Sequence, residues 1–291
     1  MLTAEQLEIR RKHVGASEWS TIFGLNPYQN AADLALEKRF GLKPDGGSDS
    51  TRAGDLLERP VLEWFTVTTG RPLRSAQEFV VNADLPLFSA TMDSLLADCN
   101  DEAAEAKTCG VVGPTPDKDR WGEAGTGEVP EWVYCQAQAQ CFVAGLARVW
   151  VPALIGGRGF QLFIVQRDTD FIGPAVERIV AWHKRHVIDG DPVTDARPNL
   201  DVLKRVRRES DKRIVIPDTL YDEVVTARDA RLAAEKVETA AQERLLYALG
   251  DAEVGVTAET ARKVTYLEYT QNRKATEAKV ITFRSLKFPK S

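Results

Sequence analysis

Apolar residues recur at helical spacing through most of the first seventy positions. The spacing predicts helices over 2–12, 31–40 and 52–69, and a further short helix that opens at Gly15-Ala16-Ser17 with Ser17 as its N-cap. Gly70 is expected to end the longest of these helices. Its predicted core positions share one face: Leu56, Leu57, Val61, Leu62 and Phe65.

From position 77 the apolar pattern becomes extended. Strands are expected over 77–81, 87–92, 94–97 and 103–108, and residues 110–127, rich in Gly, Pro and charge, are expected to form a loop. A helix over 131–144, a hairpin of strands 148–155 and 160–167, and a helix over 174–189 follow. This order predicts an α/β fold with a central mixed sheet flanked by helices.

The character of the chain changes beyond about position 198. Residues 217–249 are rich in alanine and charge and predict one long helix that packs on a partner or on its own domain. Residues 264–269 and 280–283 predict a small terminal β-hairpin. We therefore predict a core over 1–203 and a C-terminal extension over 204–291.

Composition excludes several classes of protein. With 291 residues, 43% hydrophobic and 28% charged, the chain is long enough for one main domain and an appendage. No apolar run reaches the roughly 18 residues of a membrane span, and the N-terminus has no signal-peptide centre, so we expect no membrane association and a cytoplasmic protein. The four cysteines lack zinc-site spacing and are expected to be reduced and partly buried: Cys99, Cys109, Cys135 and Cys141.

The net charge of −5 argues against a protein that coats nucleic acid non-specifically, but it leaves DNA open as a substrate. Basic residues gather over 204–213 and again over 273–290, which indicates either solvated faces or a polarised surface.

Candidate chemistry centres on Asp93 and on Glu105-Ala106-Lys107. On a continuous strand, Glu105 and Lys107 point to one side and Ala106 points into the fold. Glu105 would then ligate a hard divalent cation, the Ala106 carbonyl would add an oxygen ligand, and Lys107 would hold or polarise the attacking water. Taken alone, a Glu-x-Lys pair is more often an exposed ion pair.

Further motifs change that balance, because together they resemble one family. In order along the chain they are Val14–Glu18 continuing through Phe23–Tyr28, Gly54–Pro60, Asp93, Glu105–Lys107, and Pro130 with Tyr134–Gln138. This series resembles the YqaJ-like viral recombinases, the lambda-exonuclease type of the PD-(D/E)XK nuclease superfamily. The resemblance covers about residues 9 to 190 and implies a restriction-endonuclease-like core.

The resemblance also implies roles for individual residues. Asp93 and Glu105 match the metal ligands, Lys107 matches the catalytic lysine, and Glu58 matches the helical glutamate that completes the acidic site. Gln136, or as a second choice Gln138, matches the helix glutamine that faces the site. Three residues match a pocket for the 5′-phosphate of the substrate strand: Arg10, Ser17 and Thr91.

The implied function is a Mg²⁺-dependent 5′→3′ exonuclease, with Mn²⁺ as the alternative metal. It would act on double-stranded DNA ends and leave 3′ single strands for phage-type recombination. A homo-oligomer, a trimer by resemblance, and a single-strand annealing protein as partner are also implied. So is a phage or prophage origin, which would place the protein in the cytoplasm of a host cell. The alternatives are a PD-(D/E)XK endonuclease and a non-catalytic nuclease-like module for DNA binding or assembly.

The sequence departs from the family pattern in two places, and the second departure leaves the polarity of cutting open. Met92-Asp93-Ser94 stands where the family commonly has Pro-Asp-Gly. The arginine expected soon after Lys107 is not evident, which leaves Lys118 or Arg120 as substitutes.

Overall fold

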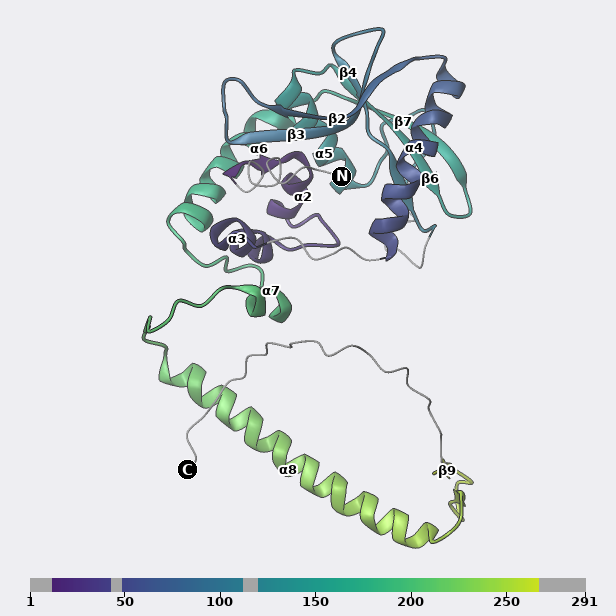
Figure 1. Cartoon of the computed structure of the whole chain (residues 1–291), viewed down its shortest axis with the longest axis vertical. Helices are drawn as coiled ribbons and strands as arrows, with labels where there is room; N and C mark the ends of the chain where they lie inside the picture. The colour runs from purple at the N-terminus through teal and green to yellow at the C-terminus, as the bar shows by residue number, and fades with distance from the viewer. Residues whose placement is uncertain (1–11, 43–48, 112–119, 267–291) are drawn as a thin grey trace, which may run out of the picture. The chain divides into compact units, whose positions relative to one another are not determined.

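The computed structural model describes residues 12–42, 49–111 and 120–266, apart from the side chains of residues 75–77 (Figure 1). By their internal contacts the residues divide into two units, Met1–Arg207 and Arg208–Ser291, each described here by itself. The helix predicted over 2–12, except for Lys12, the strand predicted over 280–283, and residues 112–119 of the loop predicted over 110–127 lie outside the described residues.

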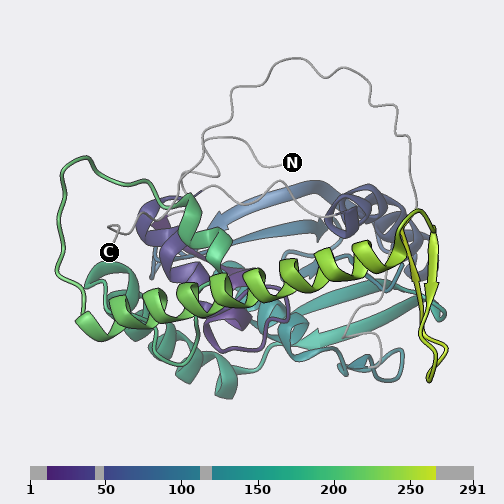
Figure 2. The ribbon, with the colours of Figure 1, turned by 90° about the horizontal axis from the view of Figure 1, so that it is seen from below.

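A mixed sheet forms the centre of the first unit. Strand β3 runs antiparallel to β2 and β4 and parallel to β1, while β6 runs parallel to β4 and β5 and antiparallel to β7. Figure 2 shows the β6–β7 hairpin in teal. The strands are β1 Val14–Gly15, β2 Leu73–Val81, β3 Phe88–Leu96, β4 Glu102–Ala104, β5 Lys107–Cys109, β6 Arg148–Ile155 and β7 Gly159–Gln166.

Helices cover both faces of this sheet, as the alternation of side chains along β6 shows. Val149, Val151 and Ala153 belong to the main core, into which α5 (Glu131–Ala144) packs. Trp150 points to the other face and lies against Phe65 of α4 (Asp49–Thr69), with ring centroids 5.8 Å apart. The other helical segments of the first unit are η1 Ala16–Glu18, α2 Trp19–Ile22, α3 Ala31–Phe40, α6 Thr169–His183, η3 Lys184–Ile188 and α7 Leu200–Arg205. The predicted α/β class with a central mixed sheet flanked by helices is confirmed.

The sheet differs from the prediction in two places that prove central to the site. β3 is one continuous strand through Asp93, not two strands on either side of it. The predicted strand 103–108 is broken between β4 and β5, because the Ala106 N–H leaves the ladder and donates to Asp93 Oδ2 at 2.9 Å. Ala106 is therefore only half-buried, whereas Glu105, expected on the outer side, is buried.

Three helix predictions are wrong in detail. Ser17 is not an N-cap: it lies within η1, which begins after Gly15, whose N–H donates to Glu18 Oε2 at 2.8 Å. Leu56 is exposed rather than in the core, although Val61, Leu62 and Phe65 are buried. Helix α6 begins at Thr169 instead of Pro174, because the Asp168 carboxylate accepts hydrogen bonds from the first free N–H groups.

The second unit contains the predicted long helix, α8 (Asp218–Leu249), and no side chain of α8 is buried. A hairpin follows, formed by β8 Val254–Val256 and β9 Lys263–Thr265. The strand that was expected to begin at 264 therefore corresponds to β9, and it pairs with β8, which precedes it in the chain. The boundary expected at 203/204 falls within α7, whose Arg205 binds Glu37 of the first unit at 3.0 Å. The division into folding domains stays a prediction.

The four cysteines are free, three of them buried and Cys99 half-buried. Among the described residues, no helix combines the length and the apolar character that crossing a bilayer requires.

Candidate active site

A cavity of about 890 Å³ is lined by α4, by the break between β4 and β5, and by the start of α5. Glu58 reaches it from α4, Asp93 from β3, and Glu105 with Ala106 from the break. Lys107 is the first residue of β5. The fold thus brings five of the predicted site residues to one cavity: Glu58, Asp93, Glu105, Ala106 and Lys107.

The Glu105 carboxylate is held by three donors. Lys107 Nζ lies 2.6 Å from Glu105 Oε1, and the Gln136 amide donates to the same oxygen. The Gln140 amide donates to Oε2 at 2.6 Å. Lys107 also donates to Gln136 Oε1 at 3.1 Å, so the lysine, the glutamate and the glutamine fix one another.

Gln140 was not predicted as a site residue. It lies one helical turn after Gln136 on α5, so both amides project from the same face toward Glu105. Applying the i, i+4 rule to Gln136 within the predicted helix would have found it. Gln138, the second choice for the helix glutamine, faces elsewhere: it donates to the Gln166 carbonyl at 2.7 Å and accepts from the Asp168 N–H at 2.8 Å.

The site carries more negative than positive charge. Burial and repulsion from Glu105 and Glu58 raise the pKa of Asp93 well above its usual range, although Lys107 and the Ala106 N–H oppose the rise. Burial disfavours the charge on Lys107, but attraction to Glu105, Asp93 and Glu58 outweighs it and raises the pKa of Lys107. Three carboxylates, Glu58, Asp93 and Glu105, line one cavity with this ammonium group, and carboxylate oxygens are the ligands that a hard divalent cation prefers.

Of the residues expected to receive a 5′-phosphate, the two that the structure describes are not at this cavity. Ser17 lies in η1 and Thr91 on β3, and neither lines the cavity. The Thr91 hydroxyl is buried and has no hydrogen-bond partner. Arg10 and Lys118 lie outside the described residues, while Arg120 is described and exposed. The 5′-phosphate pocket stays a prediction.

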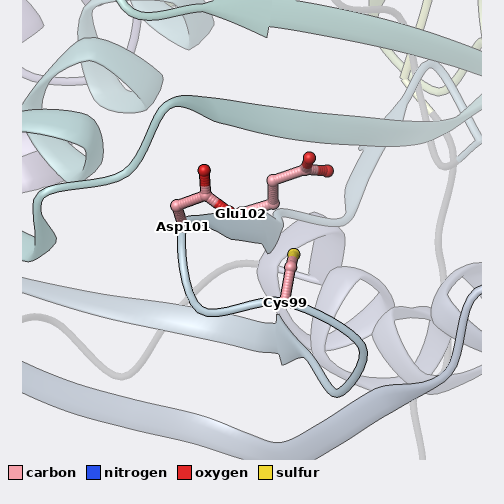
Figure 3. Close-up of side chains that lie close together, drawn as sticks. All are labelled: Cys99, Asp101 and Glu102. Carbon is pink, nitrogen blue, oxygen red and sulfur yellow. The ribbon is translucent and has the colours of Figure 1, made fainter.

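A second cluster of possible ligand atoms lies at the start of β4 (Figure 3). Ligand atoms of Cys99, Asp101 and Glu102 lie within 4.8 Å of one another. However, the Glu102 carboxylate is bound by Arg71 Nη1, by Trp150 Nε1 and by Arg148 Nε, the last at 3.4 Å. Because two guanidinium groups already neutralise Glu102, this cluster is an ion-pair network rather than a cation site.

Comparison with known proteins finds a family match over part of the chain. The family model for the YqaJ-like viral recombinase domain matches residues 5–147. The uncharacterized protein YqaJ of Bacillus subtilis (strain 168) is 27% identical over 190 residues, which span 64% of this chain and 57% of that protein. The chain therefore covers less than two thirds of the length of this relative.

Two solved structures are similar at lower identity. An alkaline exonuclease from Laribacter hongkongensis is 17% identical with a TM-score of 0.45, covering 62% of this chain and 90% of that one. A putative exonuclease from Eubacterium rectale is 14% identical with a TM-score of 0.48, covering 75% of this chain and 98% of that one.

The matched segment contains the three side chains that bind the Glu105 carboxylate, and the match agrees with the motifs noted in the sequence. We therefore conclude that residues 5–147 of this chain are similar to the YqaJ-like viral recombinase domain.

Proposed function

We propose that this protein is a metal-dependent deoxyribonuclease, an exonuclease that degrades double-stranded DNA ends 5′→3′ and leaves 3′ single strands for recombination. One observation carries the proposal: Glu58, Asp93 and Glu105 line a single cavity together with Lys107. Acidic ligands beside a lysine provide both a cation site and a group that can hold an attacking water. The recombinase family of residues 5–147 supports the proposed role in recombination.

The donor set fits Mg²⁺, with Mn²⁺ as the alternative. Asp93 and Glu105 would hold the ion, Glu58 would complete the acidic set directly or through water, and the Ala106 carbonyl would add an oxygen. When bound, the cation stabilises negative charge on the phosphate and lowers the pKa of a bound water.

Lys107 is positioned to orient rather than to deprotonate. Its raised pKa keeps the ammonium group charged at neutral pH, so it donates hydrogen bonds and cannot act as a general base in that form. Glu105 and Gln136 fix its Nζ at one place in the cavity. From there the ammonium group would hold the attacking water and offset charge on the scissile phosphate.

Digestion of end-labelled linear duplex DNA tests this proposal. We expect the wild type to release label in Mg²⁺ and to stop in EDTA, and Lys107→Ala to lose at least about 100-fold in rate, the cost of removing one electrostatic group from an active site. Lys184→Ala is the matched control, because the Lys184 side chain is 73% exposed and pairs with Asp189 away from the cavity lining. Equal rates for wild type and Lys107→Ala, with both proteins folded, would refute the assignment of the site.

Comparison of 5′-labelled linear DNA with closed circular DNA separates an exonuclease from an endonuclease and from a non-catalytic module. Label at the 5′ end is expected to leave first as short products, and covalently closed circular DNA is expected to resist. Cleavage of the closed circle would establish the endonuclease alternative. Binding of duplex DNA with no cutting in Mg²⁺ or Mn²⁺ would establish the non-catalytic module.

Assembly and partners follow from the same family resemblance. We propose a homo-oligomer, a trimer by resemblance, that works in the cytoplasm with a single-strand annealing protein. Light scattering of the full chain measures the mass in solution, and a monomer at working concentration would contradict the trimer.

A further inference from the structure

Two aromatic rings line the same cavity as the candidate catalytic residues. Tyr28 lies between α2 and α3, and Trp132 lies in the first turn of α5. Their ring centroids are 6.1 Å apart with an interplanar angle of 85°, an edge-to-face contact. Tyr28 is nevertheless 63% exposed, so most of its ring surface stays accessible. The proposed hydrolysis gives neither ring a role.

The turn that carries Tyr28 is held in place by its own hydrogen bonds. The Tyr28 N–H donates to Asn26 Oδ1 at 2.8 Å, and Asn26 Nδ2 donates to Thr21 Oγ1 at 2.9 Å, where Thr21 is buried in α2. Pro27, between them, restricts the backbone further. The ring is therefore presented on an ordered turn, and little conformational freedom is lost when something binds to it.

The aromatic pair is close to the candidate catalytic lysine. Lys107 Nζ lies 5.5 Å from the centre of the Trp132 ring and 2.6 Å from Glu105 Oε1. Successive nucleotides of one DNA strand advance about 3.4 Å along the helix axis. A strand with its phosphate at Lys107 would therefore bring a base to the aromatic pair within a few nucleotides.

We propose that Tyr28, supported by Trp132, is a stacking site for an unpaired nucleobase of the strand being cut; this inference rests on the proposed nuclease function. Proteins that hold single strands stack bases on aromatic side chains, and such stacking tolerates any sequence because every base has a π face. A base inside a duplex is already stacked on both sides. The site therefore takes a base that has left the duplex, next to the phosphate in the cavity.

A coupling experiment tests the stacking directly. Binding of short single-stranded oligonucleotides is measured in Ca²⁺, with a gel check that no cleavage occurs. One oligonucleotide carries every base, and the others each lack one base at successive positions from the 5′ end. We expect Tyr28→Ala to bind the complete oligonucleotide about 5- to 150-fold more weakly, the range for loss of one base–aromatic stack, and Tyr28→Phe to bind as wild type does.

The set of oligonucleotides that each lack one base identifies which base stacks on Tyr28. At one position, removal of the base is expected to weaken binding by wild type by a similar factor and to change binding by Tyr28→Ala little, because the stack is already gone. Tyr247→Ala is the matched control, since Tyr247 is 91% exposed on α8 in the other unit; it should keep the wild-type dependence on the missing base.

Two results would overturn the inference, and they are distinguishable. If wild type cuts duplex DNA in Mg²⁺ but the effects of Tyr28→Ala and of each missing base are additive at every position, the stacking site is wrong and the nuclease stands. If wild type cuts no DNA in Mg²⁺ or Mn²⁺, the proposed function fails and the stacking site fails with it.

Discussion

Glu105 has both carboxylate oxygens occupied by side chains of the protein, and Gln140 supplies the bond to Oε2. The other polar atom of Gln140, Oε1, is buried without a hydrogen-bond partner, which is costly for a residue that serves stability alone. This arrangement indicates that Gln140 is a positioning residue for the Glu105 carboxylate.

Gln140→Leu tests that role through metal binding. We expect about a 10- to 100-fold loss of Mn²⁺ affinity, the usual effect of removing a group that orients a metal ligand. Calorimetric titration of the DNA-free protein measures it. Gln138→Leu is the control, because Gln138 is equally buried on α5 but binds Gln166 and Asp168 instead of Glu105. Unchanged affinity in Gln140→Leu would show that Gln140 only fills space.

Asp93→Asn is expected to raise the thermal stability of the metal-free protein. The substitution removes one of three carboxylates that repel one another, while the asparagine carbonyl can still accept the Ala106 N–H. In EDTA, Asp93→Asn should melt at a higher temperature than wild type. This difference in melting temperature should shrink when Mg²⁺ is added, because the cation stabilises wild type. A lower melting temperature in EDTA would mean that the carboxylates do not repel as the geometry indicates.

Much of the site could be predicted residue by residue, because motifs record side-chain identity. Asp93, Glu105 and Lys107 lie together at the cavity as the Asp and Glu-x-Lys pattern predicted. A sequence motif does not show the tertiary contacts that determine the backbone conformation around its residues. The hydrogen bond from Ala106 to Asp93 breaks the strand, and it joins residues 13 apart whose strand register no local pattern specifies.

At the scale of elements, the junction of β7 with α6 depends on Asp168. Its carboxylate accepts from the N–H groups of Asp170 and Phe171 and from the Tyr134 hydroxyl at 2.6 Å. The Tyr134 hydroxyl and the Phe171 N–H lower the pKa of Asp168. This cap explains why α6 begins five residues before the proline that the sequence pattern favoured as its start.

The cap predicts a pH dependence of stability. Because the pKa of Asp168 is lower in the folded than in the unfolded protein, its ionised form stabilises the fold above the unfolded value of about 3.9, and this contribution is lost as the pH falls through the folded value. Asp168→Ala should therefore lower the melting temperature at pH 7, and the difference from wild type should narrow toward pH 3. A difference that is constant over this range would exclude the charged cap.

Elements with strong periodic patterns were predicted well. α5 and α8 were predicted over nearly their observed residues, and so was the β6–β7 hairpin, since buried strands with a glycine-rich turn leave a clear pattern. The strand β8 was not predicted, because the strands of this hairpin are three residues long and mostly exposed, so burial imposes no alternation on them.

At the scale of the whole molecule, the two units differ in how they are stabilised. The first unit has a large buried core, whereas α8 buries no side chain and carries surface pairs such as Arg231–Glu235 at 3.0 Å. Such exposed pairs contribute little to stability.

Truncation after Arg207 is therefore expected to leave the melting temperature of the first unit within about 2 °C of the full chain, as for surface changes worth under 0.5 kcal/mol. Calorimetry of both forms measures it. A large loss of stability in the truncated form would mean that the core depends on the second unit.

The most direct test of the central claim is the rate at which Asp93→Asn digests end-labelled linear duplex DNA at saturating Mg²⁺, compared with wild type. If Asp93 joins Glu58, Glu105 and Lys107 in one cation-dependent site, the rate falls by at least about 100-fold in a protein that remains folded. Digestion at the wild-type rate by a folded Asp93→Asn would contradict the claim.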